Sequence, residues 1–177
     1  MTSRQSHYKA DDRPTLVNYD KDNDTLRIKP RALNIIWGGD PRYWRISEGE
    51  GSAELLQVSW LEVTGQVDLS KFLKKGKEYK LKFVVELRPD NFGWGEFPIY
   101  LMVRVGSDRR VWKKDFLKSK CSGEIFEVPG EQHLTFKVPD RVRDEKLSFG
   151  MYEIWKGRWK GGLVIHEVII APAAHHA

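Results

Sequence analysis

The sequence has almost no cysteine and no long apolar run. Cys121 is the single cysteine among 177 residues, so an internal disulfide is excluded and packing must hold the fold, as in proteins of a reducing compartment. Residues 1–30 contain no apolar segment typical of a signal peptide, and no stretch approaches the roughly 20 apolar residues of a membrane span. We therefore expect a soluble, cytoplasmic protein. Cys121 can at most link two copies of the chain, and an idle thiol is the simpler expectation.

Signatures of catalysis and of metal binding are also missing. The chain has no His-x-x-x-His, no cysteine pair, no Gly-x-Ser-x-Gly and no phosphate-binding loop. Carboxylates are plentiful, but nothing in the sequence singles out a pair placed as in a glycosidase. The formal charge of +5 is modest, and no block of five like charges occurs. We expect a protein that is not an enzyme and that needs neither a cofactor nor a metal.

Alternation of apolar and polar residues is what the sequence has in abundance. In "YKLKFVVEL" the odd-numbered residues from Tyr79 to Leu87 are all apolar, and related patterns occur at 56–63, 99–105, 134–138, 147–154 and 162–170. Period-two alternation is typical of half-buried strands. Only 68–79 hints at a short helical turn. The pattern predicts an all-β fold, an antiparallel and jelly-roll-like β-sandwich of about seven to nine strands, and leaves closure into a barrel open.

The two ends of the chain lack this periodicity. Residues 1–30 are rich in Asp and Lys with scattered apolar residues, which predicts a polar, flexible tail. Residues 173–177 contain two histidines, His175 and His176, and are compatible with the remnant of a purification tag. We expect a single domain over 31–172 between these tails.

Seven tryptophans are the most informative residues. Trp60 is in phase with Leu56 and Val58 and is predicted to lie in the core, and Trp112 is predicted to point inward from a strand. The other five lie in or beside glycine-rich turns, namely Trp37, Trp44, Trp94, Trp155 and Trp159. A tryptophan in a turn is often half exposed, so several together predict a surface on which a flat ligand can stack. The alternative is that these rings plug the open end of the sandwich.

The stretch "WKGRWKGG" narrows the ligand class. If it is extended, Trp155 and Trp159 project to one side, and the other side carries the cations Lys156, Arg158 and Lys160. Aromatic rings beside charged hydrogen-bond donors suit a sugar, with its apolar C–H face and hydroxyl rim. They also suit a nucleobase with its anionic backbone. The residues alone leave both ligands open.

Three blocks of sequence carry a resemblance to a known family. They are "ALNIIWGGDPRYWRI", "SAELLQVSWLEVTGQVDLSKFLKKGKEYKLKFVVEL" and "MYEIWKGRWKGGLVIHEVIIAP". In this order and spacing they resemble the phloem protein 2 family of plants from about Lys29 to Pro172. The resemblance implies a β-sandwich lectin that binds N-acetylglucosamine oligomers and the chitobiose core of N-glycans. It also implies a phloem, cytoplasmic or nuclear location, a role in defence and a homodimer.

The resemblance also implies roles for single residues. The two tryptophans of the family's sugar-binding element correspond to Trp37 and Trp44, with Tyr43 expected to pack beneath them, and a hydrogen-bonding glutamate corresponds to Glu153. Lys146 stands where the tobacco member has a second acidic residue, so that contact is in doubt. We add residues from the other aromatic turns, so that the predicted site comprises Trp37, Trp44, Trp94, Glu153, Trp155, Trp159 and Lys160. Phe92, beside Trp94, is expected to reshape it.

Two alternatives accompany the lectin hypothesis. The first is an RNA-binding transport protein that uses the same aromatic rings and the basic rim of Lys156, Arg158 and Lys160, with steep salt dependence because bound phosphates release counterions. The second is an interaction module whose sugar site has decayed, for which Lys146 is the hint.

Overall fold

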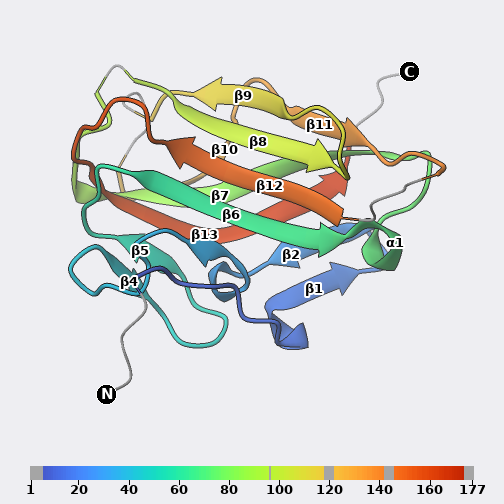
Figure 1. Ribbon diagram of the computed structural model, residues 1–177, viewed down its shortest axis with the longest axis horizontal. Coiled ribbons are helices and arrows are strands. Elements are labelled where there is room, and N and C mark those ends of the chain that lie inside the picture. Colours follow the sequence, from blue (N-terminus) through green and yellow to red (C-terminus); the bar gives the residue numbers. More distant parts are fainter. Residues whose placement is uncertain (1–5, 96, 118–121, 142–145, 174–177) are drawn as a thin grey trace.

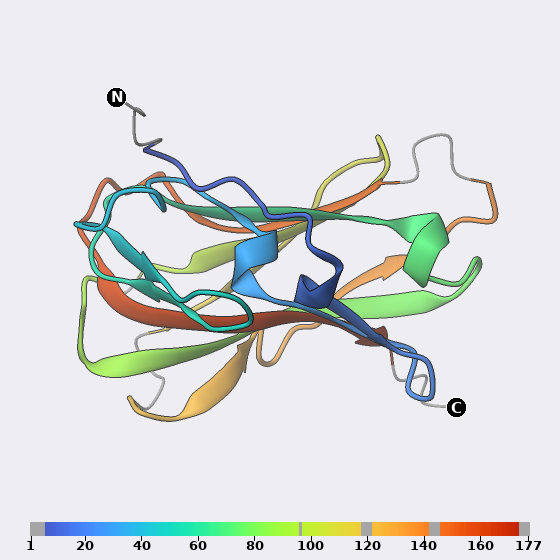
Figure 2. The same cartoon turned by 90° about the horizontal axis from the view of Figure 1, so that it is seen from below.

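Two stacked antiparallel sheets form nearly all of the protein (Figure 1). The computed structural model describes residues 6–95, 97–117, 122–141 and 146–173. Figure 2 shows the two layers edge-on, and the buried apolar side chains of both sheets form one core. The predicted all-β sandwich is confirmed, and the sheets do not close into a barrel. The described residues hold thirteen strands rather than seven to nine, because several strands have only two to five residues and too few alternations to be recognised in sequence.

The five-stranded sheet has the order β3-β6-β12-β8-β9. Its strands are β3 (Asn34–Ile35), β6 (Leu61–Asp68), β12 (Lys146–Glu153), β8 (Ile99–Val105) and β9 (Val111–Asp115). The odd-numbered residues of β6 and β12 are buried, and those between them are exposed or partly covered, except Gly150, which the Tyr152 ring covers. The even-numbered residues of β12 therefore lie on the outer face of the sandwich.

The eight-stranded sheet is built around the two longest strands, β7 and β13, which pair with each other. Its strands are β1 (Val17–Asp20), β2 (Thr25–Ile28), β13 (Gly161–Pro172), β5 (Ala53–Leu55), β4 (Trp44–Ile46), β7 (Glu78–Phe92), β10 (Ile125–Val128) and β11 (Leu134–Lys137). The alternation predicted from Tyr79 to Leu87 is confirmed, since every second residue there is buried.

Aromatic rings join the two sheets in the core. Phe83 of β7 meets Phe149 of β12 edge-on, with ring centroids 6.3 Å apart. Gly65 of β6 makes room for Phe149, because a Cβ there would lie 2.5 Å from the ring. This cross-sheet packing stabilises the sandwich and fixes the distance between the layers.

The prediction of a flexible tail over residues 1–30 is wrong for most of that segment. The turn η1 (Pro14–Leu16) leads into the hairpin of β1 and β2, and β2 pairs with β13. Leu16, Leu26 and Ile28 are fully buried. These strands have only four residues each, so one or two apolar side chains were too few to reveal them. Residues 1–5 lie outside the described part of the chain.

The remaining elements are short turns. The predicted helical turn is α1 (Leu69–Phe72), and η2 (Pro30–Ala32) precedes β3. No helix among the described residues has the length and apolarity to cross a bilayer. At the other end of the chain, the backbone N–H of Ala173 donates to the Glu78 carbonyl, which ties that residue to β7. Residues 174–177 and Cys121 lie outside the described part, so the predictions made for them stay predictions.

Candidate functional site

The tryptophans divide differently from the sequence prediction. Trp60 and Trp112, predicted to be in the core, are 43% and 41% exposed. Trp44 and Trp94, predicted to be exposed in turns, are 2% and 4% exposed. Trp37, Trp155 and Trp159 are exposed as predicted. Apart from Trp60, the exposed tryptophans fall into two separate groups of aromatic rings.

The first group surrounds a small hollow, which we call the aromatic cleft. It is lined by Trp37, Tyr43, Val58, Ser59 and Trp159 and has a volume of about 100 Å³. Tyr43 lies between the two tryptophans, with its ring centroid 5.8 Å from that of Trp37 and 6.2 Å from that of Trp159. Tyr43 is half-buried against the core, in keeping with the expected packing role, and it also lines the cleft. The cleft therefore brings together Trp37 and Trp159, which lie in two segments that the sequence analysis treated separately.

Trp37 has a strained backbone. Its φ of 64° lies in the left-handed region, which non-glycine residues rarely adopt. The backbone N–H of Trp37 donates to Nδ1 of His7 at 2.9 Å, and the two rings also meet edge-on with centroids 5.1 Å apart. Strain of this kind costs about 1–3 kcal/mol and tends to be found at ligand sites. This backbone conformation and the contacts with His7 hold Trp37 in the lining of the cleft.

A buried ion pair lies beneath the cleft. The Lys160 ammonium is 3.6 Å from the Glu153 carboxylate, and both side chains are almost fully buried. Lys160 donates hydrogen bonds to the carbonyl oxygens of Ser59 at 2.8 Å and Arg158 at 3.0 Å. Burial lowers the pKa of Lys160, although the charge of Glu153 opposes that shift. The prediction that Lys160 and Glu153 face a ligand is therefore wrong, and they hold the two loops that carry the cleft.

Trp44 and Trp94 also support the site from inside. Trp44 lies in the core from β4, and its indole N–H has no acceptor among the described residues. The Trp94 indole N–H donates to the Gly161 carbonyl at 3.0 Å. The backbone at Gly93 passes so close to Trp159 that an added Cβ would lie 2.0 Å from the Trp159 carbonyl oxygen. The prediction that Trp44 forms an exposed wall is thus wrong, and Trp94 anchors the loop behind Trp159.

The second group of rings lies on the outer face of the five-stranded sheet. We call it the aromatic corner, and it consists of Tyr100, Trp112, Tyr152 and Trp155. Trp155 is 56% exposed and stands at 75° to the ring of Tyr100 and 72° to that of Trp112. Trp155 and Trp159 therefore belong to different groups. The loop from β12 to β13 turns at Gly157, with φ of 63°, so the extended geometry considered for this stretch does not occur.

The predicted basic rim does not form. Lys160 is buried, and the charged groups of Lys156 and Arg158 both lie over the ring of Phe97, at 5.1 and 5.0 Å from its centroid. A cation over an aromatic face is attracted to the ring, so these two cations are less available to a ligand. The feature that favoured an RNA ligand is thus reduced to two cations, both next to one phenylalanine. Phe92, also predicted to reshape the site, is exposed and packs against Gly161.

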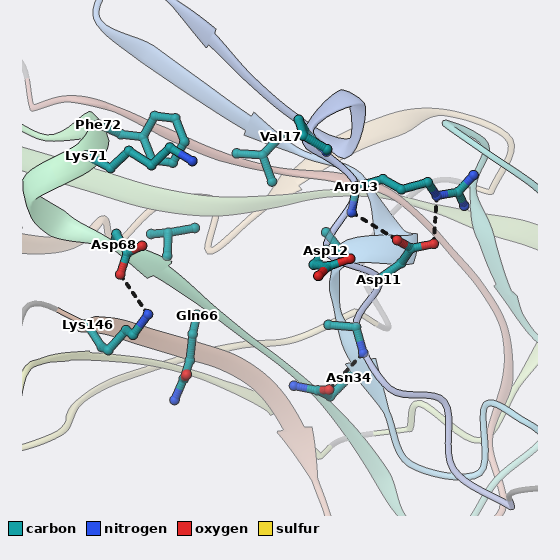
Figure 3. A pocket seen from close by; sticks show the side chains of 14 residues that line it. Asp11, Asp12, Arg13, Val17, Asn34, Gln66, Asp68, Lys71, Phe72 and Lys146 are labelled. Carbon is teal, nitrogen blue, oxygen red and sulfur yellow. Dashed lines mark hydrogen bonds and ion pairs between the residues drawn. The ribbon is translucent and has the colours of Figure 1, made fainter.

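Lys146 lies far from Glu153. The two residues are at opposite ends of β12, about 23 Å apart at ~3.3 Å per residue. Lys146 forms an ion pair with Asp68 at 2.7 Å, in the wall of a pocket of about 540 Å³ beside α1 (Figure 3). The pocket is lined by side chains of both charges, and Phe72 is its single aromatic residue. The substitution that put a sugar contact in doubt therefore lies outside the cleft.

No group of three His, Cys, Asp or Glu side chains within the described ranges is arranged to hold a metal ion. The spacing "DKDND" comes nearest in sequence. There Asp20 accepts hydrogen bonds from the backbone N–H groups of Asp22 and Asn23, while Asp24 turns inward toward two tyrosines. These carboxylates thus stabilise a turn.

Sequence reasoning missed three contributors to the cleft. His7 lies in the segment expected to be a tail, Ser59 precedes a tryptophan that was assigned to the core, and Tyr43 was given a supporting role. Tyr43 lies in the turn directly before β4, and its place in the cleft could not be read from the sequence because Trp44 was predicted to be exposed. No local signal marks His7 or Ser59.

Comparison with known proteins gives one family. Residues 23–172 match the family model described as Phloem protein 2. The chain is 37% identical to Protein PHLOEM PROTEIN 2-LIKE A9 of Arabidopsis thaliana, over 96% of this chain and 97% of that protein. It is 25% identical to a protein named Lectin from Luffa acutangula, over 85% of this chain and 72% of that protein. Its match to the putative F-box protein PP2-B12 of Arabidopsis thaliana, at 28% identity, covers 82% of this chain and 60% of that longer protein.

Proposed function

The chain belongs to the phloem protein 2 family, as its three sequence blocks had predicted, and on this basis we propose that it is a carbohydrate-binding protein of the lectin type. The relative from Luffa that carries the name Lectin supports this class of function. The observation that carries the proposal is the aromatic cleft, in which two exposed tryptophans and a half-buried tyrosine from two distant loops surround a shallow hollow.

The chemistry of the cleft suits a pyranose ring. Trp159 and Trp37 offer flat apolar faces to the C–H side of a sugar, and Ser59 lines the hollow with a hydroxyl and peptide groups that can bond sugar hydroxyls. A hollow of about 100 Å³ holds only part of a sugar, so the site is shallow. Most of the affinity must come from stacking, and several linked sugar units should bind better than one.

The finer proposal is that the sugar is an N-acetylglucosamine oligomer or the chitobiose core of an N-glycan. The support is the family resemblance together with the cleft's preference for a ligand with apolar patches, because the acetamide methyl adds one to the pyranose face. Glu153, too deeply buried to accept a bond from the sugar, acts through Lys160, which sets the spacing of the two loops.

Titration calorimetry with chitotriose at low and high salt tests the proposal. We expect Trp159→Ala to weaken binding at the cleft at least tenfold, and Trp37→Ala to weaken it less because Trp37 is the less exposed ring. The matched control is Ile125→Ala, which removes an equally accessible apolar side chain from β10.

Binding that is unchanged in Trp159→Ala would contradict the assignment of the cleft. Binding of the sugar should vary little with salt, because a neutral sugar releases no counterions. Steep salt dependence with RNA as the preferred ligand would favour the nucleic-acid alternative.

We further propose that the protein is located in the cytoplasm or nucleus of phloem cells and that it forms a homodimer. Both proposals are supported by the family resemblance alone. Fluorescent tagging in plant tissue tests the first, and sedimentation velocity tests the second.

A further inference from the structure

The outer face of the five-stranded sheet carries a second group of exposed aromatic residues that the cleft does not use. Figure 1 looks onto this face, and no described strand or helix crosses in front of β8 and β12. Register places Tyr152 of β12 beside Tyr100 of β8, and Trp112 of β9 beside Met102 of β8. Trp112 and Trp155 are 41% and 56% exposed. Exposed tryptophans that contact one another are unusual on a surface without a binding role.

The rings of the corner are held in fixed orientations. Tyr152 lies across Gly150, where an added Cβ would be only 2.6 Å from the tyrosine ring. Trp112 contacts Tyr152 with centroids 5.4 Å apart, and Trp155 contacts Tyr100 at 4.9 Å. The ring of Trp155 is nearly perpendicular to the rings of Tyr100 and Trp112, so the three rings form an L-shaped surface. Such a corner can contact a ring-shaped ligand on two sides.

The corner also has unused hydrogen-bond donors. The hydroxyls of Tyr100 and Tyr152 and the indole N–H groups of Trp112 and Trp155 make no hydrogen bond to any described residue, in contrast to the indoles of Trp60 and Trp94. Burial raises the pKa of Tyr152. The negative charge of Glu62 raises that pKa further, and the positive charge of Arg110 opposes the shift. Apolar faces with free donors suit a ligand that is itself apolar on its faces and polar at its rim.

The charges around the corner argue against the other occupants. Glu62 flanks Tyr152 on one side and Lys114 flanks Tyr100 on the other, so the rim carries both signs, whereas a nucleic acid favours cations alone. The edge strand β9 carries Lys113 and Lys114, and lysines on an edge strand disfavour pairing with the sheet of a second copy. Sugar hydroxyls both donate and accept, so they can bond groups of either sign.

We infer that the aromatic corner is a second carbohydrate-binding site, separate from the cleft, which rests on the proposed function of the cleft and extends it. The loop of residues 154–160 serves both sites, because it presents Trp155 to the corner and Trp159 to the cleft. One chain then binds two sugar units at two sites. It can bridge two glycan chains without forming a dimer, and a glycan that carries both units gains affinity by linkage.

The test is titration of the full chain with chitotriose, followed by calorimetric stoichiometry and by NMR of the seven indole N–H groups. The wild type is expected to bind two equivalents and to shift the indole signals of both groups. Trp155→Ala should lose one equivalent while the Trp159 signal still shifts, and Trp159→Ala should show the reverse. Gly150→Ala, which keeps all seven tryptophans and displaces the Tyr152 ring, should weaken the corner site about tenfold. Ile125→Ala is the unchanged control.

The outcomes separate the two proposals. One equivalent, with shifts confined to Trp37 and Trp159, overturns the second site and leaves the function of the cleft standing. Shifts at Trp112 and Trp155 alone support the corner and overturn the cleft. The absence of any binding overturns both. A wild-type dimer that Trp155→Ala converts to monomers in sedimentation velocity identifies the corner as a protein interface and overturns its assignment to sugar.

Discussion

Asp24 and Lys160 are charged side chains buried near opposite ends of the sandwich, and the fold treats them differently. Asp24 accepts hydrogen bonds from the hydroxyls of Tyr19 and Tyr79 and from the Lys77 ammonium, at 2.5, 2.8 and 2.7 Å. Its donors are side chains of β1, of β7 and of the turn before β7. Lys160 instead donates mainly to backbone carbonyls, those of Ser59 and Arg158, and its carboxylate partner Glu153 is farther away at 3.6 Å.

The pKa values of both groups are lowered, with opposite consequences for the charged form of each group. Burial would raise the pKa of Asp24, but the hydrogen bonds from Lys77, Tyr19 and Tyr79 outweigh it, so the folded state favours the charged carboxylate. Burial lowers the pKa of Lys160, so the folded state disfavours its charge. Asp24 is therefore a source of stability that pins the N-terminal hairpin. Burying the charge of Lys160 therefore lowers the stability of the fold, while its hydrogen bonds connect the two loops that form the aromatic cleft.

The largest expected effect is on stability, from Asp24→Ala. The variant removes three hydrogen bonds to a buried charge, and we expect the free energy of unfolding to fall by about 2–4 kcal/mol. Binding of chitotriose at the cleft, measured under conditions where the variant is folded, should change less than twofold. Urea denaturation gives the first quantity and calorimetry the second.

The matched control is Asp22→Ala, which changes an exposed carboxylate of the same turn. An Asp24→Ala protein that is as stable as Asp22→Ala would show that the hairpin is held by its apolar residues alone.

The second comparison is Lys160→Met, which keeps the length of the side chain and removes the ammonium. We expect a smaller loss of stability, about 1–2 kcal/mol, because relief from burying a charge offsets part of the lost hydrogen bonding. Binding at the cleft should weaken at least tenfold as the loops that carry Ser59 and Trp159 lose their common anchor. The measurements are the same two.

Lys156→Met is the control here, since Lys156 lies in the same loop and is exposed. Equal sugar affinity in Lys160→Met and Lys156→Met would mean that the cleft keeps its shape without the buried cation.

The smallest effects are on pH dependence. Since the pKa of Asp24 in the folded state is below its usual 3.8, its contribution is complete above that pH and is lost as the pH falls through the lowered pKa. The stability difference between wild type and Asp24→Asn should shrink in acid. Since the pKa of Lys160 is below its usual 10.5, the unfolded chain binds more protons between the two values, and wild type should gain stability over Lys160→Met as the pH rises through that window.

Denaturation series from pH 2 to 5 and from pH 8 to 10.5 measure these two trends. A pH-independent difference for Asp24→Asn would contradict a charged carboxylate in the folded state.

Residues of long strands were predictable, and residues of short or edge elements were not. The alternation in β7 and β12 continues over eight or more residues, so its phase reports which side faces the core. In β9 the same rule was available and was misapplied, since Trp112 has the phase of the outward-pointing Lys114. Trp60 shares the phase of Leu56 and Val58, but the chain turns before β6 begins at Leu61, so its ring points outward.

The candidate site could be predicted only in part. Trp37 and Trp159 were identified because they lie in glycine-rich turns, and both are exposed, but the same reasoning failed for Trp94, which is buried. Trp44 was misjudged because it begins the three-residue strand β4, too short for its phase to be read. Lys160 was misjudged because its acceptor on Ser59 lies 101 residues earlier in the chain. A lysine is buried only where acceptors converge on it, and local sequence does not contain them.

By itself the sequence determined the family, the two-sheet architecture and the abundance of turn tryptophans, because period-two alternation and residue composition are local properties. Only the tertiary structure decided which rings are exposed and which partners they have. Trp155 and Trp159 are four residues apart and contact different groups of rings, whereas Trp37 and Trp159 are far apart in sequence and line one cleft. The physical reason is that a turn at Gly157 redirects the chain and a buried ammonium joins loops from distant strands.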